Sequence, residues 1–208
     1  AESNRMFNVL SQRKCRWFRL DPSASFATVR LASQLPRTDD GSFLADGATT
    51  HLPDWQYVGT YFKTGPELLY SITNPIEHQM AWLDKHQPAY LTSYSESLEH
   101  LAFAWSDPQP WQGLKVFHAI SEMLTPSMRQ RIERTFPIPI IQGYGLNEIG
   151  IVALKCPAGR YHVHGEHCLV ELVGDDGQPV APGEIGRIVV TAFRNLAMPL
   201  IRYDTDDL

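Results

Sequence analysis

The sequence has few cysteines, no excess of basic residues and no long apolar run. Its three cysteines, Cys15, Cys156 and Cys168, are widely spaced among 208 residues, which argues against a disulfide framework and favours a reducing compartment. The net charge of −5 excludes the basic character of general nucleic-acid binders. No apolar run approaches the roughly 18 residues of a membrane span, and the first residues lack the apolar stretch of a secretory signal. We therefore expect a soluble, cytoplasmic protein that binds neither nucleic acid nor membrane.

Helical and strand patterns alternate through most of the chain. Apolar residues at helical spacing predict helices over 4–18, 74–86, 95–105 and 125–136. Short apolar runs predict strands over 26–33, 89–94, 114–120 and 138–142. The stretch 34–54 is rich in Gly, Pro and Asp and predicts a loop. This alternation indicates an α/β fold with a mostly parallel sheet flanked by helices.

Two of the predicted helices begin with a capping signal. Asn74 is followed by Pro75 and, three residues after Asn74, by Glu77, which is close to a capping box. Thr125 is followed by Pro126 in the same way. We expect Asn74 and Thr125 to cap their helices.

Strands and turns replace helices beyond about residue 157. The Gly-Asp-Asp-Gly turn at 174–177 lies between two apolar runs and predicts a hairpin. We therefore divide the chain into an α/β part, 1–157, and a smaller β-rich part, 158–208.

A glycine-containing loop follows the predicted strand 138–142. Ligands bind at the carboxyl ends of strands in open α/β sheets, so this loop is a candidate site. Gly143, Gly145 and Gly150 are spaced Gly-X-Gly-X4-Gly, which is neither the dinucleotide fingerprint nor the Walker loop. The glycines alone are equally consistent with a tight turn after a core strand.

Three motifs in this order resemble the adenylate-forming superfamily, and within it the phenylacetate-CoA ligase family. They are YGLNE at 144–148, GEIGRIVVT at 183–191 and PLIRYDTDDL at 199–208. The resemblance covers most of 55–208 and implies an ATP-dependent ligase that activates a carboxylic acid as acyl-AMP and transfers the acyl group to coenzyme A. ATP or AMP, Mg²⁺ and coenzyme A are the ligands implied, and a homodimer is a further expectation.

The same resemblance predicts that the chain is an internal fragment. The family's phosphate loop is expected before Ala1, and its lysine-bearing C-terminal domain after Leu208. By itself this chain is then expected to bind AMP weakly, if at all, and not to turn over.

The motifs assign roles to four residues by resemblance, and Gly145 is counted with them as part of the nucleotide-binding motif. Tyr144, beside Gly145, matches the aromatic residue that stacks on adenine, and Glu148 matches the Mg²⁺ ligand. Asp207 matches the carboxylate that accepts hydrogen bonds from both ribose hydroxyls. Asn147 stands where the family has a Thr or Ser that contacts the α-phosphate, so phosphate binding is expected to differ.

Further assignments cover the rest of the implied site. Ser121 and Glu122 lie in the segment that lines the adenine side. Tyr57, Phe62 and Tyr94 lie in segments that border the carboxylate pocket, although core packing explains these aromatic residues equally well.

The acidic end of the chain carries one departure from the family and one predicted ion pair. Asp206 replaces the glycine that precedes the ribose carboxylate in the family, which adds charge and removes backbone freedom. We expect Arg202 either to brace this loop or to pair with Asp204, and we favour the pairing.

Two alternatives remain open from the sequence. An adenylate-forming enzyme could deliver the acyl group to an amine, a hydroxyl or a carrier thiol instead of coenzyme A. Alternatively, zinc could be held in the β-rich part of a non-catalytic scaffold, where His162 and His164 would share one face of a strand. An exposed hairpin that carries histidines is the competing interpretation of these residues. The zinc candidates are Cys156, His162, His164, His167 and Cys168.

Overall fold

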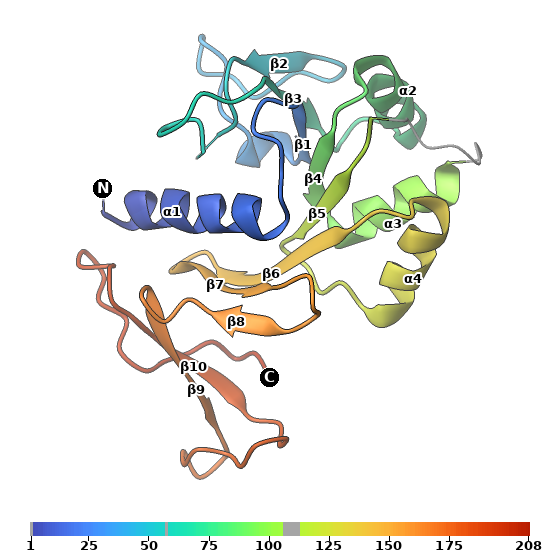
Figure 1. Ribbon diagram of the computed structural model, residues 1–208. Helices are drawn as coiled ribbons and strands as arrows, with labels where there is room; N and C mark the ends of the chain where they lie inside the picture. Colours follow the sequence, from blue (N-terminus) through green and yellow to red (C-terminus); the bar gives the residue numbers. More distant parts are fainter. Residues whose placement is uncertain (1, 57, 106–112) are drawn as a thin grey trace. The chain divides into compact units, whose positions relative to one another are not determined.

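A computed structural model describes residues 2–56, 58–105 and 113–208 of the chain (Figure 1). It contains two compact units. One comprises Cys15–Gln142, and the other comprises the residues before Cys15 together with Gly143–Leu208. The domain boundary expected near residue 157 stays a prediction. No helix in the described ranges has the length and apolar character that crossing a membrane requires.

The Cys15–Gln142 unit is built on a mostly parallel sheet. Its strands follow the order β2-β3-β1-β4-β5-β6, in which β2 is antiparallel to β3 and the other neighbours are parallel. The strand bounds are β1 Phe26–Arg30, β2 Thr49–Leu52, β3 Glu67–Ser71, β4 Tyr90–Tyr94, β5 Val116–Ile120 and β6 Ile140–Leu146. The predicted α/β class is confirmed.

Three helices cover this sheet and supply its main core. They are α2 Ile76–His86, α3 Ser95–Ala104 and α4 Pro126–Thr135, and Figure 1 shows α3 and α4 side by side. A 3₁₀ turn, η1 Ala32–Gln34, follows β1. Leu83, Leu98 and Ile132 come one from each helix and are buried with Phe117 of β5 in a single cluster. The helical periodicity of apolar residues predicted these helices, because it marks the face of each helix that is buried on folding.

The predicted loop over 34–54 is wrong at its end, because Thr49–Leu52 forms β2. This strand is short and largely polar, so it carries no alternating apolar pattern. Its pairing with the fully buried β3, in which Thr50 lies opposite Leu69, makes it a strand. A contact between distant segments therefore decides this element.

The two predicted helix caps have different outcomes. Thr125 Oγ1 accepts a hydrogen bond from Met128 N at 3.2 Å, which confirms it as the cap of α4. Asn74 is not the cap of α2, because Pro75 occupies that position without a side-chain bond. The Asn74 side chain is buried instead, donating to Ser71 O and accepting from Gly47 N, each at 2.7 Å.

The second unit contains antiparallel strands and most of the first helix. Helix α1 spans Glu2–Trp17 and belongs to this unit as far as Lys14. The last four residues of β6 pair with β7, Gly150–Lys155, which pairs with β8, Tyr161–Val163. A three-stranded sheet has the order β11-β10-β9. Its strands are β9 Cys168–Val173, β10 Arg187–Ala192 and β11 Tyr203–Asp204.

The predicted loop at Gly143 is also wrong, because β6 continues as a strand through the glycines to Leu146. Gly143 lies opposite Leu154 and Gly145 opposite Ile151, with a bulge between Tyr144 and Gly145. A Cβ atom on Gly145 would lie 2.9 Å from Gly150 O. Glycine is therefore required at position 145, because the two strands of the hairpin approach each other closely there.

Candidate functional site

The β6–β7 hairpin determines where the first motif lies. Its connection is short, with Ile149 N donating to Leu146 O at 3.3 Å and Gly150 at a φ of +95°. Tyr144 and Leu146 point to the same face of β6 because strand side chains alternate. Both pack on a small core formed by Ile149, Val152, Cys168 and Val190.

The last motif is held along β10 by backbone hydrogen bonds. Asp204 lies opposite Val189 in the antiparallel pair β10–β11. Beyond the strand, Thr205 N donates to Ile188 O at 3.1 Å, and Ile188 N donates to Asp207 O at 2.8 Å. Asp207 is thus fixed at its backbone, while its side chain is exposed.

The two motifs meet at Tyr144 and Asp207. Tyr144 Oη donates to Asp207 Oδ2 at 2.7 Å and lies 3.4 Å from Thr205 Oγ1. Burial, followed by the hydrogen bond to Asp207, raises the pKa of Tyr144 to about 12. The phenol therefore keeps its proton at neutral pH and donates to the carboxylate. An aromatic face and a carboxylate are presented together by segments 63 residues apart in sequence.

The predicted residues Asn147 and Glu148 lie at the tip of the same hairpin. Both are exposed, and Asn195 Nδ2 donates to the backbone oxygen of Glu148 at 3.1 Å. Within the described ranges neither side chain makes a hydrogen bond or an ion pair. An accessible carboxylate of this kind suits Mg²⁺, which keeps several waters and uses one or two protein carboxylates beside phosphate oxygens.

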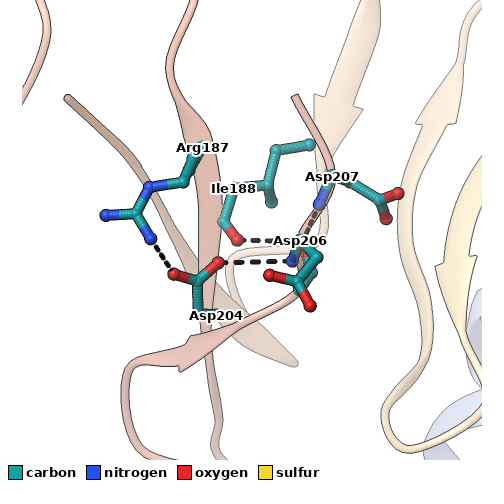
Figure 2. A network of polar contacts seen from close by, with 6 residues as sticks. Arg187, Ile188, Asp204, Asp206 and Asp207 are labelled. Carbon is teal, nitrogen blue, oxygen red and sulfur yellow. Dashed lines mark hydrogen bonds and ion pairs between the residues drawn. The ribbon is translucent and has the colours of Figure 1, made fainter. Parts of the chain in front are cut away.

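A polar network surrounds the acidic segment (Figure 2). The Asp204 carboxylate pairs with Arg187 through Oδ2 and accepts from Asp206 N through Oδ1 at 3.2 Å. Thr205 Oγ1 accepts from Asp207 N at 3.2 Å and donates to Ile188 O at 2.9 Å. Each residue from Asp204 to Asp207 is therefore tied to the sheet or to its neighbour.

The predicted pairing of Arg202 with Asp204 is wrong. Arg202 Nε lies 3.3 Å from Glu171 Oε2, and Asp204 pairs with Arg187 instead. Asp204 lies opposite Val189, so Arg187 is its diagonal neighbour on the same face of the sheet. Sequence reasoning missed Arg187 because its partner depends on the register between β10 and β11.

Ser121 and Glu122 belong to the other unit and follow β5 directly. Ser121 has a φ of +66°, the left-handed region. Glu122 Oε2 accepts from Glu96 N at 3.2 Å, and Glu122 O accepts from Ser95 Oγ at 3.1 Å. The Glu122 carboxylate therefore stabilises the amino end of α3, as an anion does near a helix dipole.

Two of the three predicted pocket residues, Phe62 and Tyr94, lie in the described part of the chain. Tyr57 lies outside the described residues, and Phe62 is half exposed. Tyr94 is buried, donates to Gln34 Oε1 at 2.5 Å and accepts from Leu31 N at 3.4 Å. A hollow of about 510 Å³ in this unit is lined by neither Phe62 nor Tyr94. Its lining is Ile72, Ile76, Gln79, Ser97, His100, Phe103 and Ala104.

The predicted zinc cluster is not formed. Among the described residues no three His, Cys, Asp or Glu side chains gather as a metal site. His164 lies beyond the end of β8 and is fully buried, whereas His162 is exposed on the strand, so they share no face. His167 Nε2 donates to Ile149 O at 2.8 Å, and burial raises the pKa of Cys168 to about 11.

His164 is committed to a contact with the first helix. Arg13 Nη1 donates to His164 Nδ1 at 2.9 Å, and Arg13 also pairs with Glu166. Burial, followed by the charge of Arg13, lowers the pKa of His164 to about 4. His164 is therefore a neutral imidazole that accepts a hydrogen bond from the Arg13 guanidinium. It contributes to packing and is not arranged as a metal ligand.

Comparisons with known proteins agree with the motifs. Residues 47–196 match the family model of the AMP-binding enzyme. The phenylacetate-coenzyme A ligase of Escherichia coli K12 is 37% identical over 93 residues, which cover 42% of this chain and 21% of that protein. The phenylacetate-coenzyme A ligase of Pseudomonas putida is 28% identical over 127 residues, covering 58% and 28% respectively.

Solved structures share the fold. A 2-hydroxyisobutyryl-CoA ligase in complex with its acyl-AMP and CoA has a TM-score of 0.74 at 15% identity, and the match covers 98% of this chain and 47% of that one. An anthranilate CoA ligase in complex with anthranoyl-AMP has a TM-score of 0.64 at 17% identity, covering 90% and 35%. The chain thus spans less than a third of the curated relatives and about half or less of these structures. The predicted resemblance is confirmed, and the chain belongs to the AMP-binding enzyme family.

Proposed function

We propose that this chain contributes the adenosine-binding part of an ATP-dependent carboxylate–CoA ligase that forms AMP. The observation that carries the proposal is the contact between Tyr144 and Asp207, which joins the two motif segments at 2.7 Å. Family membership and relatives named as CoA ligases support the reaction class and the small carboxylic acid substrate. The same relatives favour coenzyme A over another acceptor.

Asp207 and Tyr144 would hold the nucleoside from two sides. The carboxylate has two acceptor oxygens, and within the described chain only Oδ2 accepts from a side chain. Oδ1 is therefore available to a ribose hydroxyl. The Tyr144 ring offers a stacking face for adenine, because its hydroxyl is fixed at the opposite end of the side chain.

The residues at the hairpin tip would meet the phosphates. A substrate carboxylate oxygen would attack the α-phosphorus of ATP, and the bond to the pyrophosphate oxygen would break. The thiol of coenzyme A would then attack the acyl carbon and release AMP. Glu148 would hold Mg²⁺, whose positive charge would stabilise the negative charge of the phosphate groups. The Asn147 amide would donate a hydrogen bond to the α-phosphate.

Calorimetric titration with AMP tests the nucleotide site on this chain. We expect weak binding, with a Kd on the order of 1 mM, and at least a tenfold loss in Asp207→Ala because the bidentate acceptor is removed. Asp175→Ala, at an exposed acid on the β9–β10 connection, is the matched control and should bind AMP as the wild type does. Absence of AMP binding, or equal binding by Asp207→Ala, would refute the proposal.

The identity of the acyl acceptor is tested on the longer protein to which this chain is proposed to contribute. Pyrophosphate release that depends on coenzyme A supports the ligase, whereas full turnover without coenzyme A would indicate another acceptor. Robust acyl-adenylate formation by these 208 residues alone would contradict a contributing role.

Self-association and cytoplasmic location are part of the same proposal. Several large apolar side chains are more than three-quarters exposed, namely Ile185, Leu196, Ile201 and Leu208. Exposed apolar surface of this kind favours association with another copy. Light scattering should give the mass of a dimer, and a monomer mass at high concentration would rule the dimer out.

A further inference from the structure

Asp206 has a backbone conformation that its side chain does not favour. Its φ is +60°, in the left-handed region where residues with a Cβ atom are strained. Asp207 follows directly, so the direction of the Asp207 side chain depends on this turn. Something in the surrounding structure has to keep the turn in place.

Asp204 is the group that holds this turn. Its Oδ1 accepts from Asp206 N at 3.2 Å, which closes the turn across Thr205. Its Oδ2 pairs with Arg187 on β10, which is the neighbouring strand. Figure 2 shows one carboxylate oxygen directed at the Arg187 guanidinium and the other at the backbone nitrogen of Asp206.

The ion pair with Arg187 also offsets the negative charge of the acidic segment. Asp204, Asp206 and Asp207 are three carboxylates within four residues, and like charges at this distance repel. Within the described chain Arg187 is the cation paired with this cluster, because Arg202 pairs with Glu171. Removing Arg187 would therefore leave the Asp204 carboxylate without its ion pair and the three like charges without a paired cation, while the backbone hydrogen bonds to Ile188 remain.

We propose that Arg187 and Asp204 are positioning residues, which hold the left-handed turn at Asp206 and so aim the Asp207 carboxylate at Tyr144. Within the described chain neither residue is hydrogen-bonded to Tyr144, so the pair is inferred to act through Asp207. The effect that we expect on AMP affinity rests on the proposed function. The effect on the contact between Tyr144 and Asp207 does not, because it can be measured without nucleotide.

The first test measures AMP affinity by calorimetry in a set of matched variants. Asp204→Ala removes both contacts and should weaken AMP binding about tenfold, and Arg187→Met should weaken it similarly. Asp204→Asn keeps an oxygen for Asp206 N but loses the ion pair, and should cost about threefold. Glu171→Ala removes the neighbouring ion pair of the same sheet and should leave AMP affinity unchanged.

A glycine at position 206 provides the decisive comparison. Glycine adopts a positive φ without strain, so the turn no longer needs Asp204. In an Asp206→Gly background the effect of Asp204→Ala should fall below about twofold, which a double-mutant cycle detects as coupling. An undiminished effect of Asp204→Ala in that background would overturn the inference.

The second test reads the Tyr144 contact without nucleotide. Carbon-13 labelling of the tyrosine ring follows ionisation of Tyr144 by NMR, with Tyr144→Phe to assign the signal. The hydrogen bond to Asp207 contributes to the raised pKa of Tyr144, so Asp204→Ala should lower the pH of half-ionisation and Asp204→Asn should restore most of it.

The outcomes separate this inference from the proposed function. A Tyr144 signal in Asp204→Ala identical to the wild type would overturn the positioning role. If the wild type binds no AMP, the proposed function fails, and the NMR signal still decides the role of Arg187 and Asp204. Melting temperatures confirm that each variant is folded, and Arg187→Lys, which keeps the charge, should retain at least half of the affinity.

Discussion

Five residues other than glycine have a positive φ in the described part of the chain, among them Gln87, Ser121 and Asp206. Gln87 ends α2, where a left-handed residue commonly closes a helix. Asp206 differs because it lies in a bend beyond β11, where the Asp204 side chain accepts from its backbone nitrogen and the residues on either side bond to Ile188. A left-handed L-residue costs about 1 kcal/mol relative to glycine.

Asp206→Gly should therefore stabilise the protein. We expect an increase of about 0.5 to 1 kcal/mol in the free energy of unfolding, measured by urea denaturation, because relief of the backbone strain outweighs the entropy that glycine loses. Asp175→Gly is the matched control, since Asp175 has no positive φ, and there glycine should cost a few tenths of a kcal/mol. A loss of stability in Asp206→Gly would show that its side chain contributes more than the strain costs.

The β6–β7 hairpin is the element on which the candidate site depends. It carries Tyr144 on the strand and Asn147 and Glu148 at the tip, and its bulge lies directly after Tyr144. Any change in the distance between β6 and β7 is expected to move all three residues. The tightest point is at Gly145, where a Cβ atom would also lie 3.6 Å from Gly150 C.

Gly145→Ala should open this hairpin. The added methyl group would meet backbone atoms, which cannot rotate away, so we expect a loss of about 1 to 3 kcal/mol in the free energy of unfolding. Weaker AMP binding should accompany it. Gly165→Ala is the control, because no atom lies within 4 Å of its Cβ position and its φ is not positive; its cost should stay below about 0.5 kcal/mol. Equal stability of the two variants would show that the hairpin adjusts to the methyl group.

At the scale of the whole chain, one partly buried contact joins residues 151 positions apart in sequence. Arg13, in the part of α1 that belongs to the second unit, donates to the buried His164 beside Glu166. His162 and His167 are further titratable groups near His164, and both act to lower its pKa. Protonation of His164 would place a buried cation beside a guanidinium, which is unfavourable.

Mild acid should therefore destabilise the protein. The pKa of His164 is about 4 in the folded chain and about 6.5 when unfolded. The unfolded state binds the extra proton first, so stability is complete above pH 6.5 and falls as the pH drops towards 4, by about 3 kcal/mol in total. Urea denaturation at pH 7.5 and pH 5 measures this loss.

Substitution assigns the loss to one histidine. His164→Gln should remove most of the difference between pH 7.5 and pH 5, whereas His78→Gln, at an exposed histidine of α2, should preserve it. The pKa of Glu166 is lowered by its hydrogen bond with Arg13 against the effect of burial, so its contribution is lost only below about pH 4.5 and does not enter this comparison. Identical pH dependence in wild type and His164→Gln would refute the assignment.

Local patterns were enough to predict the helices and the family. The periodicity of 95–105 and 125–136 reports which faces are buried, and the Thr125 cap acts on a backbone N–H three residues away. The three motifs were recognised as residues in order, without any geometry. Their roles at Tyr144, Glu148 and Asp207 stay predictions until nucleotide binding is measured.

Interactions between distant segments could not be predicted in this way. The strand at Thr49–Leu52, the burial of Asn74 and the choice of Arg187 as the partner of Asp204 each depend on which residue lies opposite. The zinc alternative is not supported for the same reason, since Arg13 contacts His164 and Ile149 O contacts His167. The sequence alone determined which segments form helices and which family the chain belongs to, because both depend on neighbouring residues. Strand register and side-chain partners depended on the folded chain, because they arise only when segments far apart in sequence come within a few ångströms of each other.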